Sequence, residues 1–436
     1  MSPVFRPPTH YENLPLNPLR HIGIVGPIAS ADMAHLLDPT TTPRPVGYTG
    51  APLLATLIGE LLRRGYQVSA FTLSNDVPVD RTVVAHGPNL TLTYCSMRPR
   101  AWQRNGSQPG RIIDFYKFEI EAMRTAIEAV APDVIHAHWA YEFALAALAC
   151  SMPHVVTCHD SPYRIARLFS SSKPTVSAYR WLRVLMARRV LQRAKLVTAV
   201  SPYMRDAIQG MTVATIDVVP NPVDDLALQL AQPRSTPNNA RLVMICNGWD
   251  PHKNAKRAIR AFAAWKGSHP KAELHFYGSG FGTDEPGTRW CRQEGLDAGL
   301  HFHGAISHHA LLRVLPAYDL LVHPSLEESF GLVVAEAMAI GLPVVAGRQS
   351  GAVPWVVGTD GMLCDVTDEA AIALSIERAL QPGVYERISA GGIRAAAERF
   401  STKQVVDQLC SLYRRGIDDA SCVKFTATPE KLYGNH

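Results

Sequence analysis

The sequence predicts an α/β protein made of two Rossmann-like domains that face each other across a cleft. Three observations favour this class. Short β-rich runs alternate with helical segments, which is typical of parallel sheets covered by helices on both faces. A polar stretch rich in proline and asparagine, residues 231–239, interrupts this alternation near the middle of the chain. The length of 436 residues is sufficient for two separate cores.

In the first half, the β-rich runs are expected to form parallel strands. They cover residues 21–26, 67–73, 133–138, 154–159, 195–201 and 216–221. The clearest helix covers residues 51–65, where Leu53, Leu54, Leu57 and Leu61 recur at helical spacing. Gly65 follows at the position of a C-terminal cap, so the helix is expected to end there.

The same alternation resumes after the polar stretch. Further strands are expected at residues 241–248, 272–280, 300–304, 319–325 and 342–347. We therefore divide the chain into an N-terminal Rossmann-like domain (1–222), a linker (223–240), a C-terminal Rossmann-like domain (241–400) and a C-terminal helix with a tail (401–436). The C-terminal helix is expected to return to the N-terminal domain.

Composition excludes several classes of function. The net charge of +5 is modest for this length and does not indicate a nucleic-acid partner. The eight cysteines form no CxxC pair, which favours reduced thiols in a cytoplasmic protein. The first twenty residues lack the apolar core of a signal peptide, and no stretch reaches the ~20 apolar residues of a spanning helix. Peripheral contact with the inner membrane is left open.

Ligands of parallel sheets bind beyond the carboxyl ends of the strands. In the second half, the segments that follow the strands carry glycines, hydroxyls and charged groups. They are residues 247–254, 277–280, 303–307, 323–331 and 347–354. Five such segments on one edge of a sheet favour a composite pocket of nucleotide size.

Two carboxylates, Glu328 and Glu336, stand eight positions apart around a helix expected at residues 331–341. The first turn of that helix exposes backbone N–H groups and the positive end of the dipole, which suit a diphosphate. Eight helical residues span ~12 Å, whereas paired glycosidase carboxylates lie ~5–9.5 Å apart. Because Glu328 precedes the helix, spacing alone does not exclude an acid/base pair. The simpler geometry places each glutamate on a diol at opposite ends of one ligand.

The stretch "PSLEESFGLVVAEAMAIGLPVVA" resembles the signature of the retaining family 4 glycosyltransferases, with its E-x7-E motif at Glu328 and Glu336. The segments "IHAHWAYEFA", "VVTCHD", "LVTAVS", "VVPNPVD" and "NGWDPHKNAKRAIRAF" follow the family order. The resemblance implies a GT-B fold with an N-terminal acceptor domain and a C-terminal nucleotide-sugar domain. It also implies retaining transfer of a hexosyl group to a hydroxyl of a glycan, lipid-linked or small-molecule acceptor. No cofactor is expected beyond the nucleotide-diphosphate sugar itself.

The resemblance also assigns roles around the E-x7-E motif. It implies that Glu336 binds the ribose and that Glu328 lies near the transferred sugar. The backbone would contact sugar and phosphate at Phe330, Gly331, Leu332 and Val333.

Two neighbouring loops are expected to approach the phosphate and the base. Gly278, with Gly280, allows the backbone to come close to a ligand. Main-chain groups at Ile306 could pair with the edge of a base, although nothing in these loops separates uridine from guanosine.

Lys253 lies at a strand-to-helix turn, where a lysine can neutralise the charge that develops on a departing diphosphate. The family motif usually adds an arginine directly after the preceding glycine, but Trp249 occupies that position here. Either half of the cationic pair is missing, or another residue replaces it. Candidates are Lys256, Arg257 and Arg348.

In the first half, His138 and His159 follow consecutive strands and could face the cleft. The resemblance places His138 beside the transferred sugar, and packing is the alternative role for both histidines. His136 is expected to point to the opposite face of the sheet. Residues 45–52 resemble a glycine loop on the acceptor side, with Gly47 and Gly50 in place of adjacent glycines.

The sequence contains no Asp-x-Asp motif and no His/Cys/carboxylate cluster at ligand spacing, so metal-independent transfer is expected. Residues 179–195 carry six basic residues and no acid. Leu182, Leu185, Met186 and Val190 share one helical face there. Such a helix either packs on the core with a solvated basic face or lies on anionic lipid.

Two alternatives to a transferase are kept, and the departure at Trp249 motivates the first of them. One is a non-catalytic relative that binds a nucleotide or sugar. The other is a different GT-B enzyme, such as a nucleotide-sugar epimerase or hydrolase. Donor sugar, acceptor, linkage and oligomeric state are not fixed by the sequence.

Overall fold

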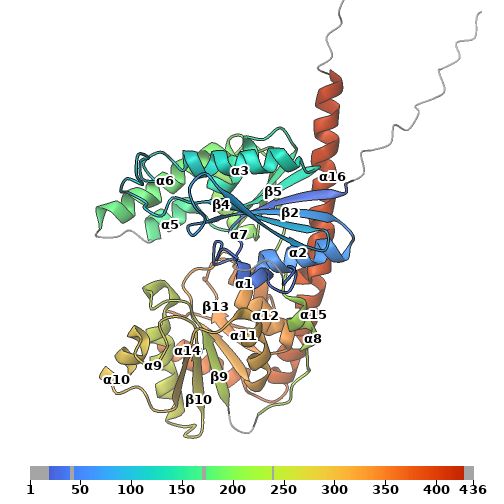
Figure 1. The fold of residues 1–436 in the computed structure, drawn as a ribbon. Coiled ribbons are helices and arrows are strands. Elements are labelled where there is room, and N and C mark those ends of the chain that lie inside the picture. Colours follow the sequence, from blue (N-terminus) through green and yellow to red (C-terminus); the bar gives the residue numbers. More distant parts are fainter. Residues whose placement is uncertain (1–18, 40–43, 169–172, 238–239, 427–436) are drawn as a thin grey trace, which may run out of the picture.

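The computed structural model describes residues 19–39, 44–168, 173–237 and 240–426. The last ten residues of the expected tail lie outside this range. Two sheets, one in each half of the chain, are covered by helices and stacked one above the other (Figure 1). The predicted α/β class with two Rossmann-like domains is therefore confirmed.

The first sheet has the strand order β3-β4-β2-β1-β5-β6-β7-β8. Its strands are β1 (His21–Val25), β2 (Gln67–Ser74), β3 (Thr82–Gly87), β4 (Leu90–Ser96), β5 (Val134–His138), β6 (His154–Cys158), β7 (Leu196–Ala199) and β8 (Ile216–Val218). All pairs are parallel except β3 with β4, which form an antiparallel hairpin at the edge. This hairpin was not predicted.

The second sheet has the order β11-β10-β9-β12-β13-β14 and is parallel throughout. Its strands are β9 (Arg241–Ile245), β10 (Glu273–Tyr277), β11 (Leu300–Gly304), β12 (Leu320–His323), β13 (Val344–Gly347) and β14 (Met362–Cys364). The order reverses between β9 and β12, and in the first sheet it reverses between β1 and β5. A crevice for a ligand forms beyond the carboxyl ends of the strands at such reversals.

The helices fill the connections between the strands. In the first half they are α1 (Ser30–Met33), α2 (Leu53–Arg63), α3 (Lys117–Val130), α4 (Glu142–Leu148), α5 (Pro162–Leu168), α6 (Pro174–Leu191), α7 (Pro202–Ile208) and α8 (Asp225–Gln229). In the second half they are α9 (Ala255–Lys266), α10 (Pro286–Gln293), α11 (His308–Val314), α12 (Leu332–Ile340), α13 (Val353–Val357), α14 (Glu369–Ala379), α15 (Val384–Phe400) and α16 (Thr402–Thr426). The described part of the chain also contains three short 3₁₀ helices, which are η1 (Gln209–Met211), η2 (Pro251–Lys253) and η3 (Leu315–Ala317). Helix α2 ends before Gly65, whose φ of 82° is the left-handed conformation expected of a cap.

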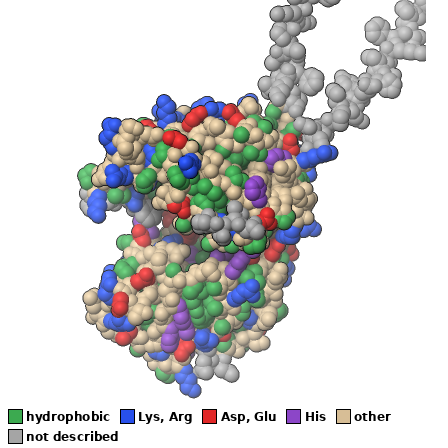
Figure 2. Space-filling model, in the orientation of Figure 1, with side chains coloured by type: hydrophobic (Ala, Val, Ile, Leu, Met, Phe, Trp, Pro, Cys, Tyr) green, Lys and Arg blue, Asp and Glu red, His purple; other side chains and the backbone are tan. Residues whose placement is uncertain are grey.

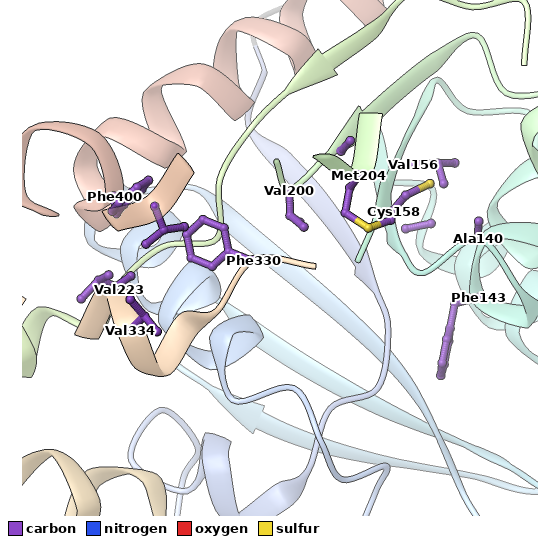
Figure 3. Close-up of a cluster of buried hydrophobic side chains, with 14 of the residues drawn as sticks. Ala140, Phe143, Val156, Cys158, Val200, Met204, Val223, Phe330, Val334 and Phe400 are labelled. Atoms are coloured by element: carbon purple, nitrogen blue, oxygen red, sulfur yellow. The ribbon is translucent and has the colours of Figure 1, made fainter. Parts of the chain in front are cut away.

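One apolar cluster joins the two halves of the chain. Phe330 and Phe400 come from the second half, whereas Val200 and Met204 come from the first, and all four are at most 2% exposed. Figure 3 shows Phe330 between Phe400 on one side and the first-domain residues on the other. Burial of such side chains contributes ~1.5–3 kcal/mol each, so this cluster holds the two domains close together at their junction.

The chain passes between the domains at two adjacent points. The backbone N–H of Val223 donates to the carbonyl of Phe400 at 2.8 Å, and the Thr402 hydroxyl donates to the carbonyl of Val223 at 2.9 Å. Beyond this junction α16 lies against α2 and buries Val406 and Tyr413 in the first domain's core (Figure 1). The last helix is thereby anchored to the first sheet.

Helix α6 carries residues 179–191 of the basic segment, and residues 192–195 follow its end. Met186 and Val190 are buried, but Leu185 is 52% exposed, so the expected apolar face is only partly correct. Residues four apart on a helix share a face, whereas Leu185 lies one position off the series of Met186 and Val190. Arg183 points inward, pairs with Glu142 and lies 3.5 Å above the ring of Tyr141. Among the described residues, no helix is sufficiently long and apolar to cross a membrane.

Candidate active site

Lys253 and Glu328 meet where the strand order of the second sheet reverses. Lys253 ends the loop after β9, and Glu328 lies in the loop after the neighbouring strand β12. The Lys253 Nζ atom is 2.7 Å from Oε1 of Glu328. Two residues that the sequence assigned to one site are therefore in direct contact, at the position where a parallel sheet binds its ligand.

The charge on Glu328 is stabilised by its neighbours. Burial opposes ionisation, but His323 and Lys253 outweigh that effect and lower the pKa of Glu328 to about 2. His323 Nε2 lies 3.5 Å from the carboxylate, which is too long for a strong hydrogen bond, so we regard Lys253 as the decisive partner. Burial lowers the pKa of Lys253, and the opposite charge of Glu328 more than restores it. Both groups are charged at neutral pH.

Helix α12 begins beside this pair. Gly331 is its N-cap, with a φ of 89°, and the helix ends at Ile340 before Gly341, close to the predicted bounds. The side chain of Phe330 is 2% exposed and packs against Trp355 and Phe400. Only the backbone of Phe330 is thus available to a ligand. The following N–H groups, at Leu332 and Val333, belong to the unpaired first turn of a helix and suit an anion.

Glu336 lies inside α12 and is 2% exposed. Its Oε1 atom is 2.6 Å from Nε2 of His308, the first residue of α11. Burial lowers the pKa of His308, but the hydrogen bond to Glu336, together with Asp224 and Asp32, raises it overall. His308 was not predicted as a site residue. In the sequence, the one indication of such a role is that His308 directly follows the loop of Ile306.

The loop that carries Glu328 is also held from across the cleft. Ser201, the N-cap of α7, donates through Oγ to the carbonyl of Ser329 at 2.7 Å. Arg164, in α5, lies 3.7 Å from Glu327 and hydrogen-bonds the hydroxyl of Tyr203. Sequence reasoning missed Arg164, although it follows β6 on the same edge as His159. It is a cation from the first domain within reach of the second.

Two glycines are required where the loops approach each other. A Cβ atom on Gly351 would lie 2.4 Å from the carbonyl oxygen of Glu328, and one on Gly278 would lie 2.1 Å from that of Cys246. Both residues also have positive φ, 64° and 118°. Backbone this close excludes any side chain. Gly351 thus supports Glu328, and Gly278 packs the loop after β10 onto that after β9.

His138 and His159 lie together in the first domain. His138 Nδ1 is 2.9 Å from His159 Nε2, and both residues are buried. Within the described residues, His138 Nε2 has no hydrogen-bond partner. Burial, with the neighbouring imidazoles, lowers the pKa of His138 well below its usual value, so the ring is neutral.

The expected orientation of His136 was wrong. Its ring centroid lies 4.0 Å from that of His138, on the same face of β5, because residues two apart in a strand point the same way. His136 hydrogen-bonds Tyr413 of α16 and Thr157 of β6. It therefore contributes to the contact between α16 and the first sheet.

The remaining predicted residues lie on exposed or irregular segments. Gly47 donates its N–H to Ser74 and has a φ of 76°, and a Cβ there would meet the carbonyl of Ile28 at 2.3 Å. Gly50 has open space around it. Ile306 is 40% exposed in the loop after β11. Gly47 is fixed by packing, whereas Gly50 and Ile306 lie free at the surface.

Trp249 packs in an aromatic cluster, and the pocket that it lines includes neither Lys253 nor Glu328. Its ring lies 5.7 Å from that of Phe281 and 5.4 Å from that of Trp290, and Lys256 Nζ lies 5.6 Å from its centre. Trp249 and Lys256 line a pocket of about 560 Å³ with Arg260 and Leu326. Arg348, another candidate second cation, hydrogen-bonds the carbonyl of Leu363 in the edge strand β14.

Among the residues that the structure describes, folding assembles two groups of metal-ligand type that the sequence spacing did not indicate. They are Asp224 with His308 and His309, and Glu273 with His275 and His301. The first group lies at the junction of the domains, where Asp224 also accepts from Thr56. His308 of that group is already bound to Glu336.

Known sequence families match both halves of the chain. Residues 230–392 match the family described as glycosyl transferases group 1, and residues 52–225 match glycosyltransferase family 4. An MMP alpha-(1->4)-mannosyltransferase of Mycolicibacterium hassiacum is 28% identical over 297 residues, 65% of this chain and 71% of that protein. A D-inositol 3-phosphate glycosyltransferase of Mycolicibacterium smegmatis is 28% identical over 380 residues, 83% of this chain and 84% of that protein.

Solved structures share the fold. The sucrose-phosphate synthase of Thermosynechococcus elongatus superposes with a TM-score of 0.70 at 20% identity, over 91% of this chain and 98% of that one. Anabaena HepE, solved in complex with UDP and glucose, has a TM-score of 0.59 at 20% identity, over 90% of this chain and 98% of that one. These likenesses confirm the GT-B fold.

Proposed function

The chain belongs to the group 1 glycosyltransferases of family 4, and we propose that it moves a hexosyl group from a nucleotide-diphosphate sugar to a hydroxyl acceptor. The proposed transfer retains the configuration at the anomeric carbon. One observation carries the proposal. The Lys253–Glu328 ion pair of 2.7 Å lies beside the first turn of α12, at the reversal point of the second sheet. A cation and a helix start together suit a departing diphosphate.

In this proposal the donor lies along the edge of the second sheet. Lys253 neutralises charge on the leaving diphosphate, and the N–H groups at the start of α12 bind its oxygens. Glu328 accepts hydrogen bonds from the transferred sugar, and Glu336 accepts them from the ribose. Because His308 holds Glu336 in the free enzyme, the ribose must share or replace that hydrogen bond.

The loops after β10 and β11 complete the proposed donor-binding site. Gly278 lets the backbone approach the phosphates, and main-chain groups at Ile306 meet the base. No metal is assigned to catalysis in this scheme, since the positive charge comes from Lys253 and the helix start. Arg164 of the first domain is the candidate second cation. Its Nη1 atom lies 3.7 Å from Oε1 of Glu327, the residue before Glu328.

The acceptor is proposed to enter from the first domain. His138 Nε2, which lacks a partner among the described residues, supports a role in binding a sugar hydroxyl, with His159 fixing its ring. The loop of Gly47 and Gly50 lies at the reversal point of the same sheet, after β1. The names of the relatives, a mannosyltransferase and inositol phosphate glycosyltransferases, favour a hexosyl donor and a sugar or cyclitol hydroxyl as acceptor.

A donor panel tests this function. The full-length protein is incubated with UDP- and GDP-activated glucose, galactose and mannose, with and without a mixture of hydroxyl acceptors, and nucleotide release is measured. Acceptor-dependent release, with a product whose anomeric configuration by NMR equals that of the donor, is the expected result. Inversion, release without any acceptor, or donor epimerisation would contradict it.

We further propose that the enzyme works in the cytoplasm. We also propose that it contacts a membrane through the helices α5 and α6. Trp181 and Leu185, four residues apart on α6, are 49% and 52% exposed, and Tyr163 of α5 lies beside Trp181. Arginines flank these apolar side chains, a combination that suits anionic lipid. Vesicle sedimentation at low and high salt tests this contact. Binding that persists in Trp181→Ser/Leu185→Ser would contradict it.

A further inference from the structure

One edge of the second sheet carries a group of histidines on the strands β10 and β11, which does not include Lys253 or Glu328. Because side chains alternate along a strand, Glu273 and His275 of β10 share a face, as do His301 and His303 of β11. The two strands are parallel, and His275 stands directly opposite His301. Figure 2 shows a histidine patch in the second domain, over the strands that Figure 1 labels β9 and β10.

The side chains of this group converge on one carboxylate. His275 Nε2 lies 3.2 Å from Oε2 of Glu273, and His301 Nε2 lies 3.6 Å from Oε1. The two imidazoles are stacked with centroids 4.5 Å apart, so both Nε2 atoms face the same side. One ligand atom from each of the three residues lies within 4.8 Å of the others. Three nitrogen and oxygen atoms at this separation can bind one ion.

A fourth residue holds His275 in the orientation that a metal ligand needs. His275 Nδ1 is 3.0 Å from His303 Nε2, and His303 is itself stacked on Tyr277 at 4.5 Å. When Nδ1–H donates to His303, the lone pair of His275 Nε2 faces the carboxylate of Glu273. In the other tautomer, Nε2–H of His275 donates to Glu273 instead, so a cation that binds here takes the place of that proton. Metal-bound histidines are usually oriented by such an outer hydrogen bond.

We propose that Glu273, His275 and His301 bind a divalent transition-metal ion, with Zn²⁺ the best match and water as the fourth ligand. Two imidazoles and a carboxylate form a zinc ligand set, whereas calcium and magnesium prefer oxygen alone. His275 is 5% exposed and His301 is exposed, so the ion has both a buried anchor and access from solvent. Arg241 Nε, 3.5 Å from Glu273, is the charge that the ion must displace.

The ion would join β10 to the edge strand β11. These strands end at Tyr277 and Gly304, directly before the loops of Gly278 and Ile306. A metal bridge between the two strands would therefore stiffen the base of both loops. This site is independent of the proposed catalytic role of Lys253 and Glu328.

Zinc titration of the full-length, untagged and chelator-stripped protein tests the site. Isothermal titration calorimetry with ZnCl₂ is expected to show one equivalent bound in the micromolar range. His301→Gln and Glu273→Gln should each abolish this binding, and both substitutions fall on partly exposed side chains. His303→Phe keeps the stacking on Tyr277 but removes the outer acceptor, and should weaken binding ~10–100-fold. Circular dichroism without zinc confirms that each variant is folded.

His309→Gln is the matched control, because His309 belongs to the other group of metal-ligand type. It should leave the zinc isotherm unchanged. X-ray absorption of the zinc complex should show two imidazoles and no sulfur. The proposal is overturned if the wild-type protein binds no zinc, if His301→Gln binds it as tightly, or if only His309→Gln removes it.

Discussion

Nζ of Lys253 lies 2.7 Å from Oε1 of Glu328, and this ion pair joins the loops that follow two adjacent strands of the second sheet. Neither side chain is fully buried: 31% of the lysine and 19% of the glutamate side chain are exposed. The pair is therefore held in place yet reachable by a ligand. In the proposed reaction, the donor inserts its diphosphate and sugar around the two groups, each of which is already in the required charge state.

Glu328→Gln is expected to lower kcat at least ~10²-fold, since it removes a preorganised charge next to the reacting sugar. The amide keeps the size of the carboxylate, so the fold and the affinity for free nucleotide should remain. Turnover is measured with the donor identified by the panel, and nucleotide affinity by calorimetry. Full activity of this variant would refute the assignment of Glu328.

Lys253→Met is expected to lower both kcat and the affinity for nucleoside diphosphate, because Lys253 is assigned to the diphosphate. Lys253→Arg keeps the charge and should retain more activity than the methionine variant, although its geometry differs. Loss of the ammonium also raises the pKa of Glu328, since Lys253 is among the groups that lower it. The measurements are kcat, KM and the calorimetric affinity for UDP and GDP. Unchanged nucleotide affinity in Lys253→Met would contradict the role.

Gly351→Ala is expected to destabilise the protein by ~1–3 kcal/mol and to lower turnover. The new Cβ would lie 2.4 Å from the carbonyl oxygen of Glu328 and 3.0 Å from Tyr203, at a φ of 64°. The loop of Glu328 must then move. Gly210→Ala is the control, because no heavy atom lies within 4 Å of a Cβ at that position. Denaturant unfolding and steady-state kinetics should separate the two variants.

Much of the fold was predictable because it depends on local patterns. Alternating β-rich and helical segments, a polar linker and Gly65 after a leucine-patterned helix are all features of neighbouring residues. The β3–β4 hairpin was missed. It connects through a two-residue turn in which Asn89 has a φ of 56°, and it pairs at an edge where no helix separates the strands. Turn chemistry of this kind was the signal that was overlooked.

The site was predictable only in part. Lys253 and Glu328 each follow a strand. Their contact depends on the pairing of β9 with β12, and these two strands are far apart in the sequence. The partner of Glu336 could not be read from the sequence, because His308 lies on another helix, 28 positions away. The expectation for His136 failed for a simpler reason. Strand side chains repeat every two residues, so His136 and His138 had to share a face.

Trp249→Phe is expected to leave kcat and donor KM close to wild type. Trp249 lies in an aromatic cluster with Phe281 and Trp290, and the pocket that it lines includes neither Lys253 nor Glu328. Trp249→Ala should cost ~2–4 kcal/mol of stability by removing a packed ring. Trp249→Arg, which restores the family residue, should destabilise the fold without raising kcat. A large rise in kcat for the arginine variant would show that Trp249 stands in a functional position.

The His308–Glu336 hydrogen bond should make stability depend on pH. The pKa of His308 is raised in the folded protein, so folding favours the protonated imidazole. The resulting stabilisation is fully present below the unfolded pKa of about 6.5. It is lost as the pH rises through the higher folded pKa.

His308→Gln removes this contribution. The difference in free energy of unfolding between wild type and His308→Gln should therefore be larger at pH 6 than at pH 9, by ~1–2 kcal/mol. Denaturant unfolding across this range measures it. His309→Gln is the control, because the side chain of His309 is 51% exposed and lies 3.4 Å from Asp224 rather than on Glu336. A difference that stays constant with pH, or that grows toward pH 9, would show that His308 is not charged against Glu336. The proposal that a ribose shares or replaces the hydrogen bond between His308 and Glu336 would then lose its support.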